Sequence, residues 1–319
     1  MRLRLLVVGL GIGLTIPLAN VVRADTYPSK PIRIVAGEAG GSTDFMSRLV
    51  APGLAASMGQ PVIVQNRGGN GLPQSLVANA SPDGYTLLLN GSPVWLLPFL
   101  QDKVAYDPIR DFFVITLTSS SPNVLVVHPS MPATSVKDLI ALAKAKPGQL
   151  NYSSSPAGST PHLAAELFKS MAGIKMLWVP YKSASPALVA LLGGEVQLMF
   201  ATPLSAAPHV KTSRLRALAV TSPEPTALAP GLPTVASAGL PGYETRSMQA
   251  IWAPAKTSSA ISRRLNEEIV RVLNQPEMKR KVFEFGSEVV TCSPAEALSI
   301  IKADMARMGK VIRDTGAHE

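Results

Sequence analysis

The chain lacks most of the features by which enzymes, metal proteins and disulfide-linked proteins are recognised. Its single cysteine, Cys292, allows no disulfide bond within the chain. It contains no G-x-x-x-x-G-K-[ST], H-E-x-x-H or G-x-S-x-G motif. His128, His209 and His318 show no metal-ligand spacing with carboxylates or with the cysteine. The serine-rich turns have no base and orienting residue near them, so we expect no enzymatic activity, no metal ion and no cofactor.

Basic residues are in excess but are not gathered on one segment. Thirty Lys and Arg against 21 Asp and Glu give a net charge of +9, yet Lys279-Arg280-Lys281 is the longest basic run. A nucleic-acid-binding surface usually combines a basic stripe with aromatic residues, and this pattern is missing. We therefore expect no nucleic-acid partner.

Long apolar runs are also scarce, apart from one at the N-terminus. Arg2 and Arg4 precede an almost wholly apolar stretch over residues 5–18, and Val22-Arg23-Ala24 follows it. This order is typical of a secretory signal peptide at residues 1–24, cleaved after Ala24. The apolar run is shorter than the roughly 20 residues of a spanning helix, so an uncleaved anchor is the weaker alternative. Without Arg2, Arg4 and Arg23 the exported chain keeps 27 basic residues and a charge of +6. We expect a periplasmic protein.

The 319 residues are enough for two lobes, because a single core stops growing at about 250–300 residues. Short apolar runs alternate with helical patterns, which predicts an α/β fold with largely parallel sheets. Strands are expected at residues 32–35, 62–65, 85–89, 124–127, 151–154, 176–179, 196–200, 215–220 and 244–253. Helices are expected at residues 43–57, 136–144, 161–171, 186–192, 204–210, 259–273, 276–285 and 294–312. Pro52 should kink or shorten the first helix.

The segment Ala39-Gly40-Gly41-Ser42-Thr43-Asp44 joins an expected strand to an expected helix. Glycines let the backbone approach a ligand closely, and a helix start offers unpaired N–H groups to an anion. The pattern therefore indicates an anion-binding turn. Ser42, Thr43 and Asp44 are also good helix caps, so a helix start without a ligand is the alternative.

A second turn of the same kind occurs at Ser154-Ser155-Pro156-Ala157-Gly158-Ser159-Thr160. Serines end a strand, a glycine follows, and Ser159 or Thr160 caps a helix that begins with a proline. Two such turns, one from each lobe, can hold a small carboxylate across a cleft. His162 in the first helical turn is either a ligand contact or a packing residue. Tyr181, at the end of a strand, either faces the cleft or packs at a lobe edge.

Beyond these turns, the chain resembles the periplasmic solute-binding receptors of tripartite tricarboxylate transporters, often called Bug receptors. The resemblance covers essentially the whole exported chain. It rests on these segments: Tyr27-Pro28-Ser29-Lys30-Pro31-Ile32-Arg33, Gly40-Gly41-Ser42-Thr43-Asp44, Gln65-Asn66-Arg67, Pro82-Asp83-Gly84-Tyr85-Thr86-Leu87, Ala105-Tyr106-Asp107-Pro108, Asn123-Val124-Leu125-Val126-Val127, His162-Leu163-Ala164, Val179-Pro180-Tyr181-Lys182, Leu192-Gly193-Gly194-Glu195-Val196-Gln197 and Leu240-Pro241-Gly242-Tyr243-Glu244.

The resemblance implies a two-lobed periplasmic-binding-protein-like fold with a ligand cleft between the lobes. Residues 25–122 and 247–319 would form lobe 1, and residues 123–246 would form lobe 2. It also implies a monomer that binds a small organic carboxylate and delivers it to integral membrane transporter subunits. A periplasmic sensor that signals to a membrane kinase is the alternative.

The chain departs from the family pattern in ways that bear on the ligand. Glu38 would place a negative charge near the first turn, and Pro156 removes a backbone donor from the second. Ala201 and Thr202 stand where many relatives carry an aspartate that meets a ligand amine. The expected site therefore includes both turns, His162, Tyr181, Ala201 and Thr202, and favours an acid without an amine.

Overall fold

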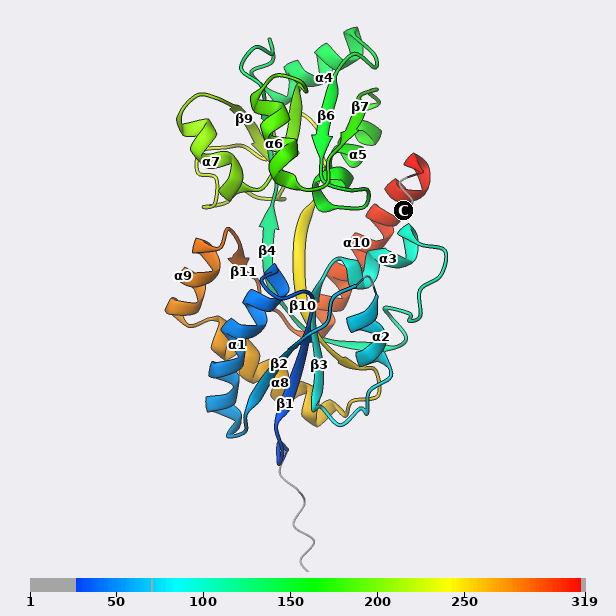
Figure 1. The fold of residues 1–319 in the computed structure, drawn as a ribbon, viewed down its shortest axis with the longest axis vertical. Helices are drawn as coiled ribbons and strands as arrows, with labels where there is room; N and C mark the ends of the chain where they lie inside the picture. The colour runs from blue at the N-terminus through cyan, green and yellow to red at the C-terminus, as the bar shows by residue number, and fades with distance from the viewer. Residues whose placement is uncertain (1–26, 70, 317–319) are drawn as a thin grey trace, which may run out of the picture.

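The computed structural model describes residues 27–69 and 71–316, which form two lobes joined end to end (Figure 1). The predicted signal peptide and His318 lie outside the described residues. Each lobe contains one β-sheet with helices on both faces, so the predicted two-lobed α/β fold is confirmed.

The sheet of lobe 1 has six described strands in the order β11-β4-β10-β3-β1-β2. Their bounds are β1 (Ile32–Ala36), β2 (Val62–Asn66), β3 (Thr86–Gly91), β4 (Phe112–Pro122), β10 (Arg246–Pro254) and β11 (Glu288–Val289). Its helices are α1 (Ser42–Met58), α2 (Leu72–Ala78), α3 (Pro93–Leu100), α8 (Ser259–Leu273), α9 (Pro276–Glu284) and α10 (Pro294–Thr315).

Apolar side chains that point alternately to the two faces of the sheet form two cores in lobe 1. Ile32 and Ile34 belong to the apolar cluster under α1 and α8, whereas Val35 belongs to the cluster that includes α3 and α10. Successive side chains of a strand point to opposite faces, so one sheet can bury helices on both sides.

The sheet of lobe 2 has five described strands in the order β7-β6-β8-β5-β9. They are β5 (Val124–Val127), β6 (Asn151–Ser154), β7 (Leu177–Pro180), β8 (Leu198–Ala201) and β9 (Arg216–Val220). The helices are α4 (Val136–Ala145), α5 (Thr160–Ala172), α6 (Ala184–Leu192) and α7 (Pro203–Lys211).

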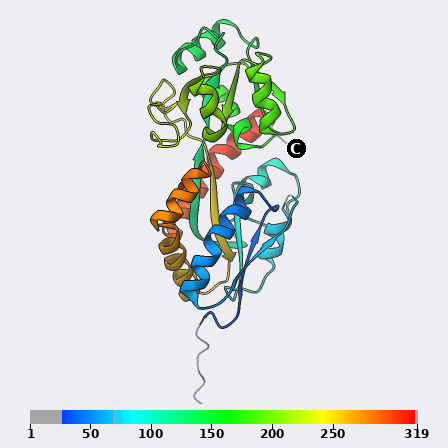
Figure 2. The same cartoon turned by 60° about the vertical axis from the view of Figure 1, so that its left-hand side comes forward.

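Two strands carry the chain between the lobes. The chain leaves lobe 1 through β4, which is followed after Asn123 by β5, and returns through β10. β4 and β10 pair antiparallel from Arg246↔Pro122 to Pro254↔Phe112, so the two crossings lie side by side. The terminal helix α10 packs on α3 and β4 and also on α5 of lobe 2, and Figure 2 shows it running toward that lobe.

The prediction of largely parallel sheets was wrong. Both sheets are mixed: β1 pairs parallel with β2 and β3, but β10 pairs antiparallel with β3 and β4. In lobe 2, β6 pairs parallel with β7 and β8, but β5 pairs antiparallel with β8 and β9. β4 runs from lobe 1 toward lobe 2 and β10 runs back, so these two neighbouring strands must be antiparallel. The lobe boundaries at residues 122/123 and 246/247 stay a prediction.

Pro52 does not shorten α1, which continues to Met58. The helix packs on α8, and a side chain at Gly53 would meet Val272 at 2.7 Å, so the two helices approach closely there. We infer that this packing offsets the backbone bond that the proline removes.

Candidate functional site

A cavity of about 510 Å³ lies between the lobes. Lobe 1 lines it with Ser42 and Thr43 of α1 and with residues of α3, β10 and α10. Lobe 2 lines it with Ala157, Gly158, Ser159 and Thr160, and with Leu163 of α5. A smaller adjoining cavity of about 270 Å³ shares Ser42, Thr160, Ser247 and Gln249 with the first. The starts of α1 and α5 therefore meet at one place in the cleft.

The first loop, residues 38–41, is a tight turn before α1. The Gly41 amide donates to the Glu38 carbonyl at 3.2 Å, and Gly40 has a φ of +79°, which favours glycine. The carboxylate of Asp44 accepts the Gly40 amide at 2.9 Å. Thr43 accepts the Gly37 amide through its hydroxyl at 3.1 Å. Gly41 is the N-cap residue, so these side chains hold the loop and do not cap the helix from the N-cap position.

Asp44 is buried and stays ionised. Its pKa lies below the usual aspartate value, first because of the Gly40 amide and then because of the Asn66 side chain. Arg48 pairs with it at 2.8 Å on the outer side.

The second loop, residues 156–159, repeats the first. The Ser159 amide donates to the Pro156 carbonyl at 3.1 Å, and Gly158 has a φ of +74°. His162 Nδ1 accepts the Gly158 amide at 3.2 Å, in the place that Asp44 takes in the first loop. Ser159 is the N-cap residue but makes no side-chain capping bond; its hydroxyl donates to the Ser155 carbonyl at 3.3 Å.

The loops differ in the amides that remain free for an anion. A helix leaves its first N–H groups without partners inside the helix. In the described part of the chain, no acceptor meets the N–H groups of Ser42, Thr43 and Asp44. In α5, Pro161 has no N–H, which leaves Thr160 and His162. The free N–H groups of α1 and of α5 lie at the positive end of each helix dipole, where a carboxylate is stabilised by about 0.3–1 kcal/mol per helix.

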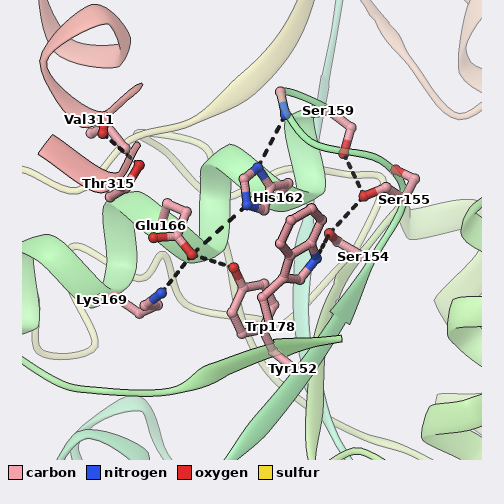
Figure 3. Close-up of polar contacts among 11 residues, drawn as sticks. Tyr152, Ser154, Ser155, Ser159, His162, Glu166, Lys169, Trp178, Val311 and Thr315 are labelled. Atoms are coloured by element: carbon pink, nitrogen blue, oxygen red, sulfur yellow. Dashed lines mark hydrogen bonds and ion pairs between the residues drawn. The ribbon is translucent and has the colours of Figure 1, made fainter. Parts of the chain in front are cut away.

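Several expected site residues form the loops or lie behind them. Within the described residues, His162, Asp44, Ser154, Ser155, Gly40, Gly41 and Ala39 do not line either cavity. His162 and Ser154 are buried; the Ser154 hydroxyl accepts from Trp178 Nε1 at 2.8 Å and donates to the Ser155 carbonyl at 2.8 Å. Figure 3 shows the His162 ring between the second loop and Glu166.

The remaining expected residues lie toward lobe 2. Tyr181 packs at the edge of the third apolar cluster, which was one of its two predicted positions. Ala201 is buried in that cluster, whereas Thr202 lines the smaller cavity and caps α7 by accepting the Ser205 amide at 3.3 Å. Glu38 lies outside both cavity linings, with its side chain over Gly68. Its charge is therefore directed to the β2–α2 connection.

No sequence pattern predicted the wall of the larger cavity beyond the two loops. Its apolar part consists of Pro93, Leu96, Leu97, Leu100, Leu163 and Met308. Its polar part includes Arg246, Gln249 and Asp304. They come from strands and helices distant in sequence, so no local motif could have assembled them.

A chain of charges runs behind this wall. Glu244 pairs with Arg246 at 3.3 Å and with Arg307 at 3.2 Å. Asp304 accepts Trp95 Nε1 at 2.8 Å and pairs with Arg307 at 3.3 Å, while burial raises its pKa. Arg246 Nε faces Glu244 Oε1 in the ion pair, whereas Gln249 Oε1 is buried without a hydrogen-bond partner. A buried polar atom without a partner is costly, so Gln249 Oε1 is a candidate acceptor for a ligand donor.

The family model described as "Tripartite tricarboxylate transporter family receptor" matches residues 46–317. The chain belongs to this family of receptors. Protein BugT from Bordetella pertussis (strain Tohama I) is 36% identical over 318 residues, covering 98% of this chain and 97% of BugT. The resemblance read from the sequence is confirmed.

Solved receptors share the fold. The R. palustris protein Rpa4515 with adipate has a TM-score of 0.72 and 35% identity, covering 91% of this chain and 98% of that one. MatC from Rhodopseudomonas palustris with bound malate has a TM-score of 0.70 and 26% identity, covering 90% and 100%. Among the described residues of this receptor, no helix is long and apolar enough to cross a membrane, and no cluster of three metal-binding side chains occurs.

Proposed function

We propose that this receptor is exported, binds a small organic carboxylate between its lobes and delivers it to membrane transporter subunits. The observation that carries the proposal is the meeting of two helix N-termini, one from each lobe, in a single cavity. Ser42 and Thr43 on one side and residues 157–160 on the other would donate amides and hydroxyls to one carboxylate. Binding without chemistry is expected, because among the described residues no hydroxyl that lines the cavity hydrogen-bonds to a base, and Asp304 is occupied by Trp95 and Arg307.

The rest of the cavity defines the kind of acid. Leu96, Leu97 and Leu100 offer an apolar surface to a hydrocarbon body. Both carboxylate oxygens of Asp304 already have partners, so this group does not call for a ligand amine. Arg246, which pairs with Glu244 at 3.3 Å and lines the cavity, provides a second polar point that can donate hydrogen bonds. We infer an amine-free acid with a short apolar body and a second acceptor group; adipate and malate, bound by the two relatives, are both dicarboxylates.

Calorimetry with three acids of matched length tests this ligand class. Adipate carries two carboxylates, hexanoate carries one, and 6-aminohexanoate replaces the second carboxylate with a cation. We expect adipate to bind most tightly and 6-aminohexanoate most weakly, with micromolar binding corresponding to about 8 kcal/mol. In Arg246→Gln the advantage of adipate over hexanoate should shrink about tenfold. Equal affinities for all three acids would contradict the assignment of the second polar point.

A further inference from the structure

The two loops share two hydrogen bonds at equivalent positions. Glu38-Ala39-Gly40-Gly41 and Pro156-Ala157-Gly158-Ser159 both close with an amide-to-carbonyl bond across the turn. In both, a glycine of positive φ donates its amide to the side chain four residues later. That side chain is the third residue of the helix, the position from which a capping box reaches back toward the N-cap. The similarity marks this contact as part of how each loop is held.

In the second loop the acceptor is an imidazole nitrogen. A ring nitrogen that accepts an N–H cannot carry its own proton, so Nδ1 is deprotonated in this arrangement. The proton then resides on Nε2, which faces Glu166 Oε1 at 3.9 Å. The ring is therefore neutral while it holds the Gly158 amide.

The groups around His162 are consistent with a neutral ring. Glu166 accepts hydrogen bonds from Tyr152 of β6 and from Lys169 of α5, the latter at 2.6 Å (Figure 3). Lys169 thus balances the carboxylate that would otherwise favour an imidazolium. Trp178 of β7 covers the ring at a centroid distance of 4.2 Å. Burial lowers the pKa of His162, with Glu166 acting in the opposite direction.

We propose that His162 is a positioning residue of the ligand site: its neutral imidazole holds the Gly158 amide and so aims the first amides of α5 into the cleft. The inference rests on the proposed carboxylate site, because it assigns the His162 side chain a role behind that site, while the backbone amide of His162 stays among the donors to the ligand. Removing the acceptor frees the loop, so the amides of Thr160 and His162 lose their common direction and the anion binds more weakly.

The first loop suggests the matched variants. Asp44 shows that a short side chain at this helical position reaches the glycine amide, so His162→Asn can supply an acceptor from the same place. His162→Leu fills the space without an acceptor. Asp44→Asn is the control in the other loop, since it retains an acceptor there while losing charge.

Two measurements on the full exported chain separate the possibilities. Amide hydrogen exchange of Gly158, followed by NMR, reports the loop without any ligand. Calorimetry with adipate reports the site. We expect His162→Leu to speed Gly158 exchange and to weaken adipate binding about tenfold, and His162→Asn to remain within about threefold of the wild type in both.

Each other outcome has a definite meaning. If His162→Asn behaves like His162→Leu, the ring's packing and not its acceptor holds the loop, and the proposal is overturned. Slow Gly158 exchange in His162→Leu would overturn it as well. If the wild-type chain binds neither adipate nor malate, the proposed ligand class fails, while the exchange comparison still decides whether His162 holds the loop.

Discussion

The first and second loops reach one geometry with different chemistry. In the first, a buried carboxylate holds Gly40, and Arg48 and Asn66 compensate its charge. In the second, the imidazole of His162 holds Gly158, and the ion pair of Glu166 and Lys169 lies beyond the ring. The first loop offers more free amides, because α5 has a proline in its first turn. In both loops a carboxylate therefore lies behind the proposed anion site, and a cationic side chain pairs with it.

The loops also differ in how they meet the opposite lobe. A side chain added at Gly40 would meet nothing within 4 Å, whereas one added at Gly158 would meet the methyl groups of Leu100 at 2.7 and 2.8 Å. Leu100 belongs to α3 of lobe 1, so the second loop is a contact between the lobes. Substitutions at the two glycines should separate backbone strain from obstruction of the cleft.

The largest effect is expected from Gly158→Ala, compared with Gly40→Ala. Both place a side chain on backbone of positive φ, at about 1–2 kcal/mol. Gly158→Ala also pushes against Leu100, which adds about 1–3 kcal/mol of overpacking. Calorimetry should show that the affinity for adipate falls about a hundredfold in Gly158→Ala and about tenfold in Gly40→Ala. Equal losses of affinity in the two variants would mean that Leu100 does not limit the approach of the lobes.

A second test concerns the carboxylate of the first loop. Asp44→Leu leaves the Gly40 amide and the Asn66 side chain without their acceptor, and should lower the free energy of unfolding by about 3 kcal/mol. Asp44→Asn can still accept the Gly40 amide and should cost about 1 kcal/mol. Urea denaturation followed by circular dichroism measures both. An Asp44→Leu variant as stable as the wild type would show that the loop is held by Thr43 alone.

Mild acid should act on the second loop. His162 has a lowered pKa in the folded chain, so below the ordinary histidine pKa of about 6.5 the unfolded chain binds the extra proton. Stability should therefore fall as the pH drops from about 7.5 to about 5.5, by up to about 1 kcal/mol from this residue. The difference between wild type and His162→Asn over that range isolates the contribution. Parallel stability curves for the two proteins would exclude it.

The smallest effect is expected at Ser42. Its side chain makes no hydrogen bond to another described residue, and its contribution to the site is its backbone amide, which survives substitution. Ser42→Ala should weaken adipate binding less than about threefold, as measured by calorimetry. A loss of adipate affinity beyond tenfold would show that the hydroxyl of Ser42, and not its amide, makes the main contact.

Much of the framework was predictable from local patterns. The glycine turns at Gly40 and Gly158, and the strands before them, follow from short apolar runs ending in small residues. The strand β4 was not predicted, because Ser119, Ser120 and Ser121 obscure its pattern although they are the part that crosses to lobe 2. The helices α2 and α3 and the short strand β11 were also missed.

The site was predictable only in its backbone. Residues 157–160, Ser42 and Thr43 line the cavity, and N–H groups without a partner inside the helix are a local property of a helix start. The sequence left Asp44 and His162 open between a ligand contact and a capping or packing role, since it shows which residues are near a turn but not on which side of it they lie. Arg246 and Asp304 join the cavity through the crossing strand and α10, which is a consequence of tertiary folding.

Gly158 lies so close to the methyl groups of Leu100 that the approach of this loop to α3 depends on the absence of a side chain at position 158. The helix α10 also packs on α5, so Leu100 is one of several contacts between the lobes. Position 100 is therefore a place where the fit between the lobes can be altered while both helix-start loops keep their own residues.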